Sequence, residues 1–177
     1  MTLVARLGRD RRGAAAAEMA LVAPLLCAIL IGSVEVGSYF YNEHILVKAV
    51  RDGARYASRQ SFSYYESGTP ATCASPTNST MINNVRSLVR TSLLASGTDR
   101  FPDIDNSDIT VTATCLTTVS SQSMTGIYRG RTGGTAGAPV VTVTASVDYD
   151  PVIGAAFGFS GVGLKLNASQ QAAVMGI

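Results

Sequence analysis

A long apolar run near the N-terminus constrains this chain more than any other feature of its sequence. Residues 14–34 are 21 positions with a single charged side chain, Glu18. At 1.5 Å per residue, a helix of this length spans about 30 Å, the thickness of a bilayer's hydrocarbon core. Residues 1–13 carry four arginines and one aspartate, and the positive-inside rule places such a flank in the cytoplasm. The sequence therefore predicts a single-pass helix with a cytoplasmic N-terminus, in contact with the lipid bilayer.

Two common interpretations of such a run fit incompletely. A removable secretory signal has only 7–15 apolar residues followed by a small-x-small cleavage site, and residues 35–40 offer no such site. An uncleaved signal anchor fits the length and the orientation. It gives no reason for Glu18, although a carboxylate inside a membrane helix costs a few kcal/mol and by default has a functional partner.

A third interpretation accounts for the glutamate. Residues 11–18 read Arg-Arg-Gly-Ala-Ala-Ala-Ala-Glu, which resembles the processing site of prepilins: a basic leader ending in glycine, then an apolar helix with glutamate at its fifth position. The resemblance implies that a prepilin peptidase cuts between Gly13 and Ala14. It also implies that Glu18 neutralises the new terminal amine of a neighbouring subunit during assembly, because neither charge is tolerated alone in a low dielectric. The alternative is that Glu18 merely snorkels to the membrane face.

Two further segments, residues 35–41 and 49–57, resemble the signature of TadE-like proteins, the minor pseudopilins of tight-adherence (Flp-type) pilus systems. The signature residues carried over to this chain are Glu35, Arg51, Gly53, Ala54 and Arg55. The resemblance covers residues 9–58. It implies three partners, namely the prepilin peptidase, other pilin and pseudopilin subunits, and an inner-membrane assembly platform. It implies residence in the inner (cytoplasmic) membrane and then in the pilus or at the cell surface.

Beyond the membrane the helix is expected to continue to about Ser58. Apolar positions recur there at helical spacing and predict a packed face, on which Gly53 implies a close neighbour. These positions are Tyr39, Leu46, Val50, Gly53 and Ala57. A basic stripe, defined as Lys48, Arg51, Arg55 and Arg59, follows the same helix. Asp52 is spaced to pair with Lys48 and Arg55, so the stripe is either a solvated, salt-bridged face or a subunit-docking patch.

The remaining sequence predicts a helix followed by strands. After a polar connection over residues 61–78, capping candidates Ser79 and Thr80 begin an amphipathic helix that ends near Gly97. Alternation predicts strands at 109–115 and 141–149, with a third over 164–174. Residues 120–139 are expected to be a mobile excursion, and the glycine-rich residues 151–163 either a hairpin or a sticky surface for another pilin.

The predicted fold class is therefore α+β and pilin-like: a long N-terminal transmembrane helical stem, then a small domain with a helix and an antiparallel sheet. The expected organisation is a cleaved basic leader (1–13), a transmembrane and assembly helix with its extracytoplasmic extension (14–58), and an extracytoplasmic domain (59–177). In that oxidising compartment Cys73 and Cys115 are candidates for a disulfide, with free thiols or a link to another subunit as alternatives.

No pattern in the sequence favours catalysis. His44 is the only histidine, and no cysteine or carboxylate cluster at ligand spacing accompanies it, so we expect no metal. Phosphate-loop and dinucleotide fingerprints are missing, hence no cofactor is expected. The net charge of +2 gives no reason to expect nucleic acid as a partner. We therefore expect a non-enzymatic minor pilin of a tight-adherence pilus that serves surface attachment. The alternative is an uncleaved signal-anchored envelope protein with an adhesive or binding outer domain.

Overall fold

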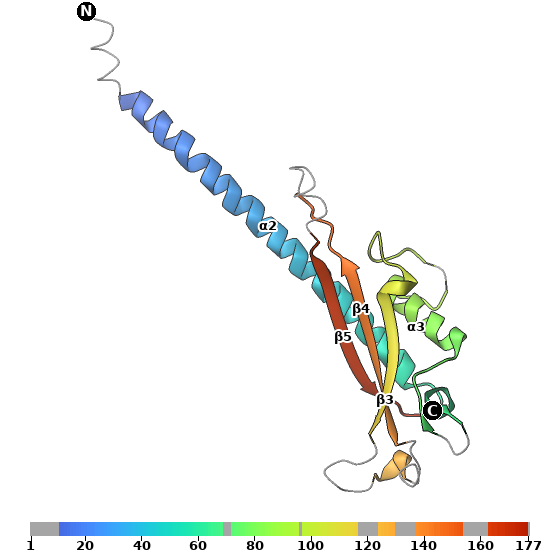
Figure 1. The fold of residues 1–177 in the computed structure, drawn as a ribbon. Coiled ribbons are helices and arrows are strands. Elements are labelled where there is room, and N and C mark those ends of the chain that lie inside the picture. The colour runs from blue at the N-terminus through green and yellow to red at the C-terminus, as the bar shows by residue number, and fades with distance from the viewer. Residues whose placement is uncertain are drawn as a thin grey trace, which may run out of the picture. The chain divides into compact units, whose positions relative to one another are not determined.

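The predicted α+β class is confirmed by the computed structural model, in which a long N-terminal helix precedes a small domain with a helix and antiparallel strands (Figure 1). The structure describes residues 11–68, 72–95, 97–116, 124–129, 137–153 and 163–176. These residues fall into two compact units. One contains the described residues up to Phe40 and Asp150–Ile153, and the other contains the rest.

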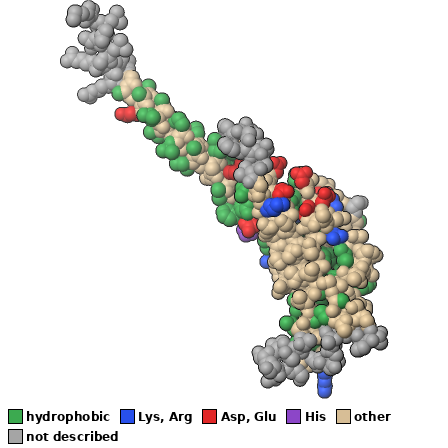
Figure 2. All heavy atoms as spheres, viewed as in Figure 1, with side chains coloured by type: hydrophobic (Ala, Val, Ile, Leu, Met, Phe, Trp, Pro, Cys, Tyr) green, Lys and Arg blue, Asp and Glu red, His purple; other side chains and the backbone are tan. Residues whose placement is uncertain are grey.

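Helix α2 (Arg11–Ser58) contributes its residues up to Phe40 to the first unit, where large apolar side chains such as Leu21, Leu25 and Ile29 are exposed. Its most apolar 18-residue stretch has a mean hydropathy of 2.2, and none of it is buried. Figure 2 shows hydrophobic side chains along this helix. Such a helix fits a single-pass membrane anchor. The helix already includes Arg11, Arg12 and Gly13, so it extends to the N-terminal side of the expected processing site; residues 1–10 of the expected leader lie outside the described residues.

In the second unit, the C-terminal part of α2 has the apolar face that the sequence predicts. Leu46, Val50 and Ala57 are fully buried, and the helix ends at Ser58 as expected. The polar connection over residues 61–78 has more structure than expected. It contains a 3-10 helix, η1 (Phe62–Tyr65), and the paired strands β1 (Glu66–Ser67) and β2 (Thr72–Cys73). The buried hydroxyl of Tyr65 donates to the Ala57 carbonyl at 2.6 Å, and this carbonyl also accepts the Gln60 N–H at 3.1 Å. Burial raises the pKa of Tyr65.

Helix α3 (Ser79–Thr91) follows, with both ends misplaced by the sequence analysis. Its N-cap is Asn78, whose side chain accepts from the Met81 N–H, so Ser79 and Thr80 are not the caps. It ends at Thr91, six residues before Gly97, because Ser92 takes a left-handed conformation (φ 68°) and the Thr91 hydroxyl accepts from the Leu93 N–H.

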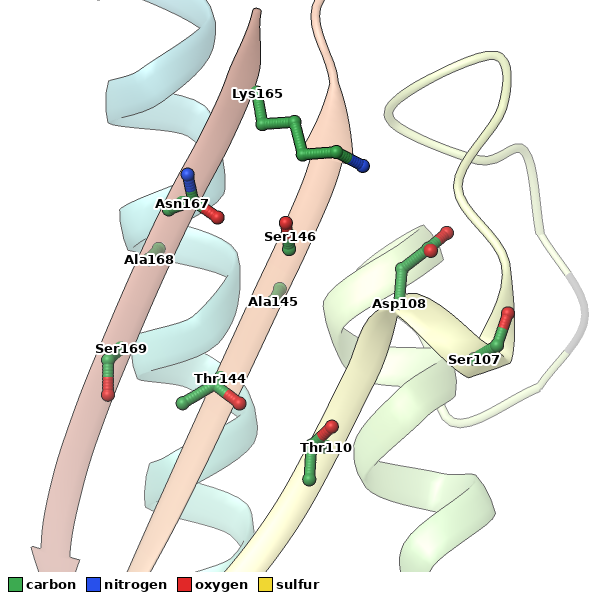
Figure 3. A pocket seen from close by; sticks show the side chains of 10 residues that line it. All are labelled: Ser107, Asp108, Thr110, Thr144, Ala145, Ser146, Lys165, Asn167, Ala168 and Ser169. Carbon is green, nitrogen blue, oxygen red and sulfur yellow. The ribbon is translucent and has the colours of Figure 1, made fainter. Parts of the chain in front are cut away.

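All three predicted strands form one antiparallel sheet in the order β3 (Ile109–Leu116), β4 (Ala138–Asp148) and β5 (Lys165–Ala173). Its inner face is buried and aliphatic, as the alternation predicts, with Val111 opposite Val143 in the register. Its outer face is polar, and Figure 3 shows its hydroxyl and amide side chains around a shallow hollow of about 530 Å³. β4 and β5 are antiparallel neighbours, which favours the hairpin interpretation of residues 151–163, although residues 154–162 lie outside the described residues.

The excursion over residues 120–139 is partly packed, contrary to expectation. Its described part holds the 3-10 helix η3 (Gly126–Tyr128). The Tyr128 hydroxyl donates to the Val174 carbonyl at 2.7 Å, and its ring meets Phe62 edge-on at 5.9 Å between centroids. An aromatic side chain with a hydroxyl partner therefore fixes this part; residues 117–123 and 130–136 lie outside the described residues.

Cys73 and Cys115 join β2 to β3, with sulfurs 2.07 Å apart and Cα atoms 5.9 Å apart. A bond closing a loop of this length contributes about 2–4 kcal/mol. Reduction should therefore lower the Tm of the second unit by about 10 °C in the detergent-purified full chain. The control is Cys27→Ser, which removes the free thiol and should leave the Tm unchanged. An unchanged Tm on reduction, or three labelled thiols in freshly isolated protein, would contradict the pairing.

Candidate functional site: the stem helix and its signature residues

The residues of the expected processing site lie in the first turns of α2 and are exposed. A Cβ added at Gly13 would meet no atom within 4 Å, so the fold itself does not need a glycine there. Ala14 and Glu18 are four residues apart and therefore lie on the same side of the helix, one turn from each other. Any requirement for glycine at position 13 must come from a binding partner.

Glu18 is exposed on the apolar part of α2 and has no hydrogen bond or ion pair within the described part of the chain. A carboxylate in lipid without a partner is costly. The arrangement thus leaves its charge available for a group that another molecule supplies.

Glu35 has partners that the sequence analysis did not identify. Its two carboxylate oxygens accept the backbone N–H groups of Val152 (3.1 Å) and Ile153 (3.0 Å). Hydrogen bonds to a charged acceptor are the stronger kind, so this signature residue ties the segment after β4 to the helix. More than a hundred residues separate the partners, and only the signature itself marks Glu35 as special.

Four signature residues lie on two sides of α2. Gly53 faces α3, and a Cβ there would lie 2.8 Å from Cγ2 of Val89 and 3.3 Å from Cγ1 of Val85. The close neighbour that the sequence predicted for Gly53 is therefore α3. Arg51 and Arg55 are exposed and, with buried Ala54, form one wall of a groove of about 340 Å³. Residues 170–172 of β5 form the other wall.

The basic stripe is exposed, as its interpretation as a solvated face requires. The prediction that Asp52 pairs with Lys48 and Arg55 is wrong. In the described part of the chain, Asp52 pairs with Arg100 at 3.9 Å, not with Lys48 or Arg55. The loop after α3 brings Arg100 to this position, with its N–H donating to the Arg90 carbonyl at 2.8 Å.

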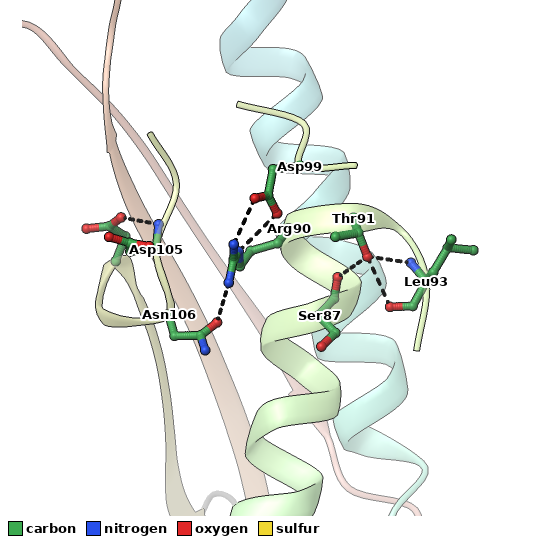
Figure 4. Close-up of polar contacts among 8 residues, drawn as sticks. Ser87, Arg90, Thr91, Leu93, Asp99, Asp105 and Asn106 are labelled. Atoms are coloured by element: carbon green, nitrogen blue, oxygen red, sulfur yellow. Dashed lines mark hydrogen bonds and ion pairs between the residues drawn. The ribbon is translucent and has the colours of Figure 1, made fainter. Parts of the chain in front are cut away.

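The side chain of Arg90 holds the same loop in place. Its guanidinium donates to both carboxylate oxygens of Asp99 (2.8 and 3.1 Å) and to Asn106 (Figure 4). The hydrogen bond to Asp99 raises the pKa of Arg90. Asp52 is therefore neutralised from outside its own helix, which leaves the stripe without the acid the sequence had assigned to it.

Replacing Gly53 with valine should destabilise the second unit by about 2 kcal/mol, because the added atoms would overlap the buried side chains of α3. Thermal unfolding of the purified full chain should show a Tm lower by about 6 °C or more. Gly37→Val is the matched control, since a Cβ at Gly37 meets no atom within 4 Å. Equal Tm values for the two variants would show that the close approach at Gly53 is not needed.

Among the described residues, no group of three or more His, Cys, Asp or Glu side chains could hold a metal ion. A family model described as TadE-like protein matches residues 13–55, a span that includes Gly13, Glu18, Glu35 and Arg55. Neither a curated protein nor a solved structure matches the chain. The resemblance drawn from the sequence is thereby confirmed over residues 13–55, and this match supports an association with tight-adherence pili.

Proposed function

We propose that the chain is a non-enzymatic minor pilin or pseudopilin that takes part in assembling a tight-adherence (Flp, type IV-like) pilus for surface attachment. In this proposal a prepilin peptidase removes residues 1–13, and α2 serves first as a membrane anchor and then as an assembly stem. The N-terminus is cytoplasmic, and the second unit is extracytoplasmic. Other pilin subunits and the inner-membrane assembly platform are its partners.

One observation carries the proposal: Glu18 lies on an unburied apolar helix, one turn from Ala14, inside the TadE-like segment. Cleavage before Ala14 would create an amine at the very end of that helix. Transfer of the helix from lipid into a fibre would bury both charges, and pairing between subunits would offset that cost.

Recovery of the chain with sheared pili tests the proposal. Mass spectrometry of purified pili should find its peptides, and deletion of the chain should reduce piliation and attachment. Strict retention in the membrane, with normal piliation in the deletion strain, would contradict the proposal.

The alternative is an uncleaved anchored protein with a binding domain. The observation in its favour is the open polar hollow on β3, β4 and β5. The hollow has no aromatic side chain and Lys165 and Asp108 as its charged groups, so it offers little affinity for a small ligand. We therefore favour the pilin.

A further inference from the structure

The groove between α2 and β5 has two cationic groups on one wall and none on the other. Arg51 and Arg55 are four residues apart on α2, which separates them by about 6 Å along the helix axis. The opposite wall carries the uncharged residues Gln170, Gln171 and Ala172. Neither guanidinium has an ion pair within the described part of the chain. The groove therefore favours a partner that presents two carboxylates about 6 Å apart.

The same chain carries such a pair on its surface. Asp103 and Asp105 are exposed on either side of Ile104, which is buried. Two residues of extended chain span at most about 7 Å, so the two carboxylates can match the spacing of the two arginines. Neither aspartate has an ion pair within the described part of the chain. The Asp105 side chain also accepts the backbone N–H of Asp108 in a capping box, and its charge helps to raise the pKa of Arg90.

The acidic pair and the groove lie on different flanks of α2 in the second unit. Successive residues of a helix are 100° apart, and Ala54 faces β5 whereas Gly53 and Tyr56 face α3, where the Tyr56 hydroxyl accepts from Asn84. The loop that carries the acidic pair is held on the α3 flank by the ion pairs of Arg100 and Arg90. The acidic pair therefore cannot reach the groove of its own copy, but it can reach the groove of a second copy.

We infer that the groove of one copy binds Asp103 and Asp105 of a second copy, in a head-to-tail contact. Because the two surfaces differ, the contact is heterologous, and it repeats along a fibre when the rotation between copies does not close a ring. Charge balance is consistent with this, since without residues 1–13 the chain has 10 basic and 11 acidic side chains. The inference deepens the proposed function and rests on it for the statement that copies meet in one membrane or fibre.

Cysteine cross-linking of the full chain in its native membrane tests the contact. Cys27→Ser first removes the free thiol. A chain that carries both Arg55→Cys and Asp103→Cys should then form a ladder of disulfide-linked dimers, trimers and longer species under mild oxidation. Arg51 and Asp105 remain in this variant and should maintain the contact. Each substitution alone should give monomers. The matched control pairs Asp103→Cys with Thr112→Cys, on the exposed face of β3, and should also stay monomeric.

Charge reversal separates this contact from random collision. Adding Arg51→Glu should weaken the ladder about two- to fivefold, the effect of an exposed ion pair, and adding Asp105→Lys to that variant should restore it. A ladder that Arg51→Glu leaves unchanged overturns the inference. So do dimers from Arg55→Cys alone, which indicate a two-fold contact, and the absence of any ladder, as expected if anionic lipid or a different subunit fills the groove.

The contact uses none of the residues of the processing site. The same cross-linking in a Gly13→Leu background therefore reports on the contact even if leader cleavage does not occur. A ladder in this background, together with a wild-type chain that keeps its leader, would refute the proposed processing and support the contact. A cleaved wild-type chain that gives no ladder would support the processing and refute the contact.

Discussion

Glu18→Ala is expected to exclude the chain from pili while leaving its membrane insertion and leader cleavage intact. Alanine makes α2 more apolar, so insertion should not suffer. In the fibre, however, the terminal amine of a neighbouring Ala14 would lose its counter-charge in a low dielectric, which costs several kcal/mol. Since each 1.4 kcal/mol is a factor of ten, we expect at least a hundredfold less chain in the sheared pilus fraction relative to the membrane fraction.

Quantitative immunoblotting of the two fractions measures this ratio. Glu43→Ala is the control, because it removes a carboxylate of the same helix outside the apolar run and should leave the ratio near the wild-type value. If Glu18→Ala enters pili as efficiently as the wild-type chain, Glu18 has no role in assembly and only snorkels to the membrane face.

Gly13→Leu is expected to leave the full leader attached to essentially all of the protein. The fold has room for the larger side chain, since a Cβ at this position meets no atom within 4 Å, so a defect would be one of recognition by the peptidase. Intact mass of the membrane-extracted protein distinguishes the two forms. Gly32→Leu replaces a glycine of the same helix that also has open space around it, and it should be processed normally. Normal removal of residues 1–13 in Gly13→Leu would refute the prepilin assignment.

The elements that were predicted from the sequence are those set by local periodicity. The apolar face of α2 and the alternating faces of β3 and β4 repeat over several turns or residues, so single exceptions do not hide them. Helix ends depend on fewer atoms. All three residues at 78–80 are good N-caps, so the sequence does not single out Asn78 as the cap of α3. The helix ends at Thr91 because Ser92 adopts a left-handed backbone conformation that serine seldom adopts.

The contacts that were not predicted join residues far apart in the chain. Asp52 has suitable partners one turn away, yet it pairs with Arg100 because the loop after α3 is anchored beside it. Glu35 binds backbone N–H groups, which carry no sequence signal. Tyr128 was assigned to a mobile excursion by the composition around it, whereas its own hydroxyl finds the Val174 carbonyl.

The N-terminal residue of the mature wild-type chain, isolated from its native membrane, tests the central claim most directly. Mass spectrometry of its N-terminal peptide should find Ala14 as the first residue, with residues 1–13 removed. An intact N-terminus beginning at Met1 would contradict the claim and leave an uncleaved anchor in its place.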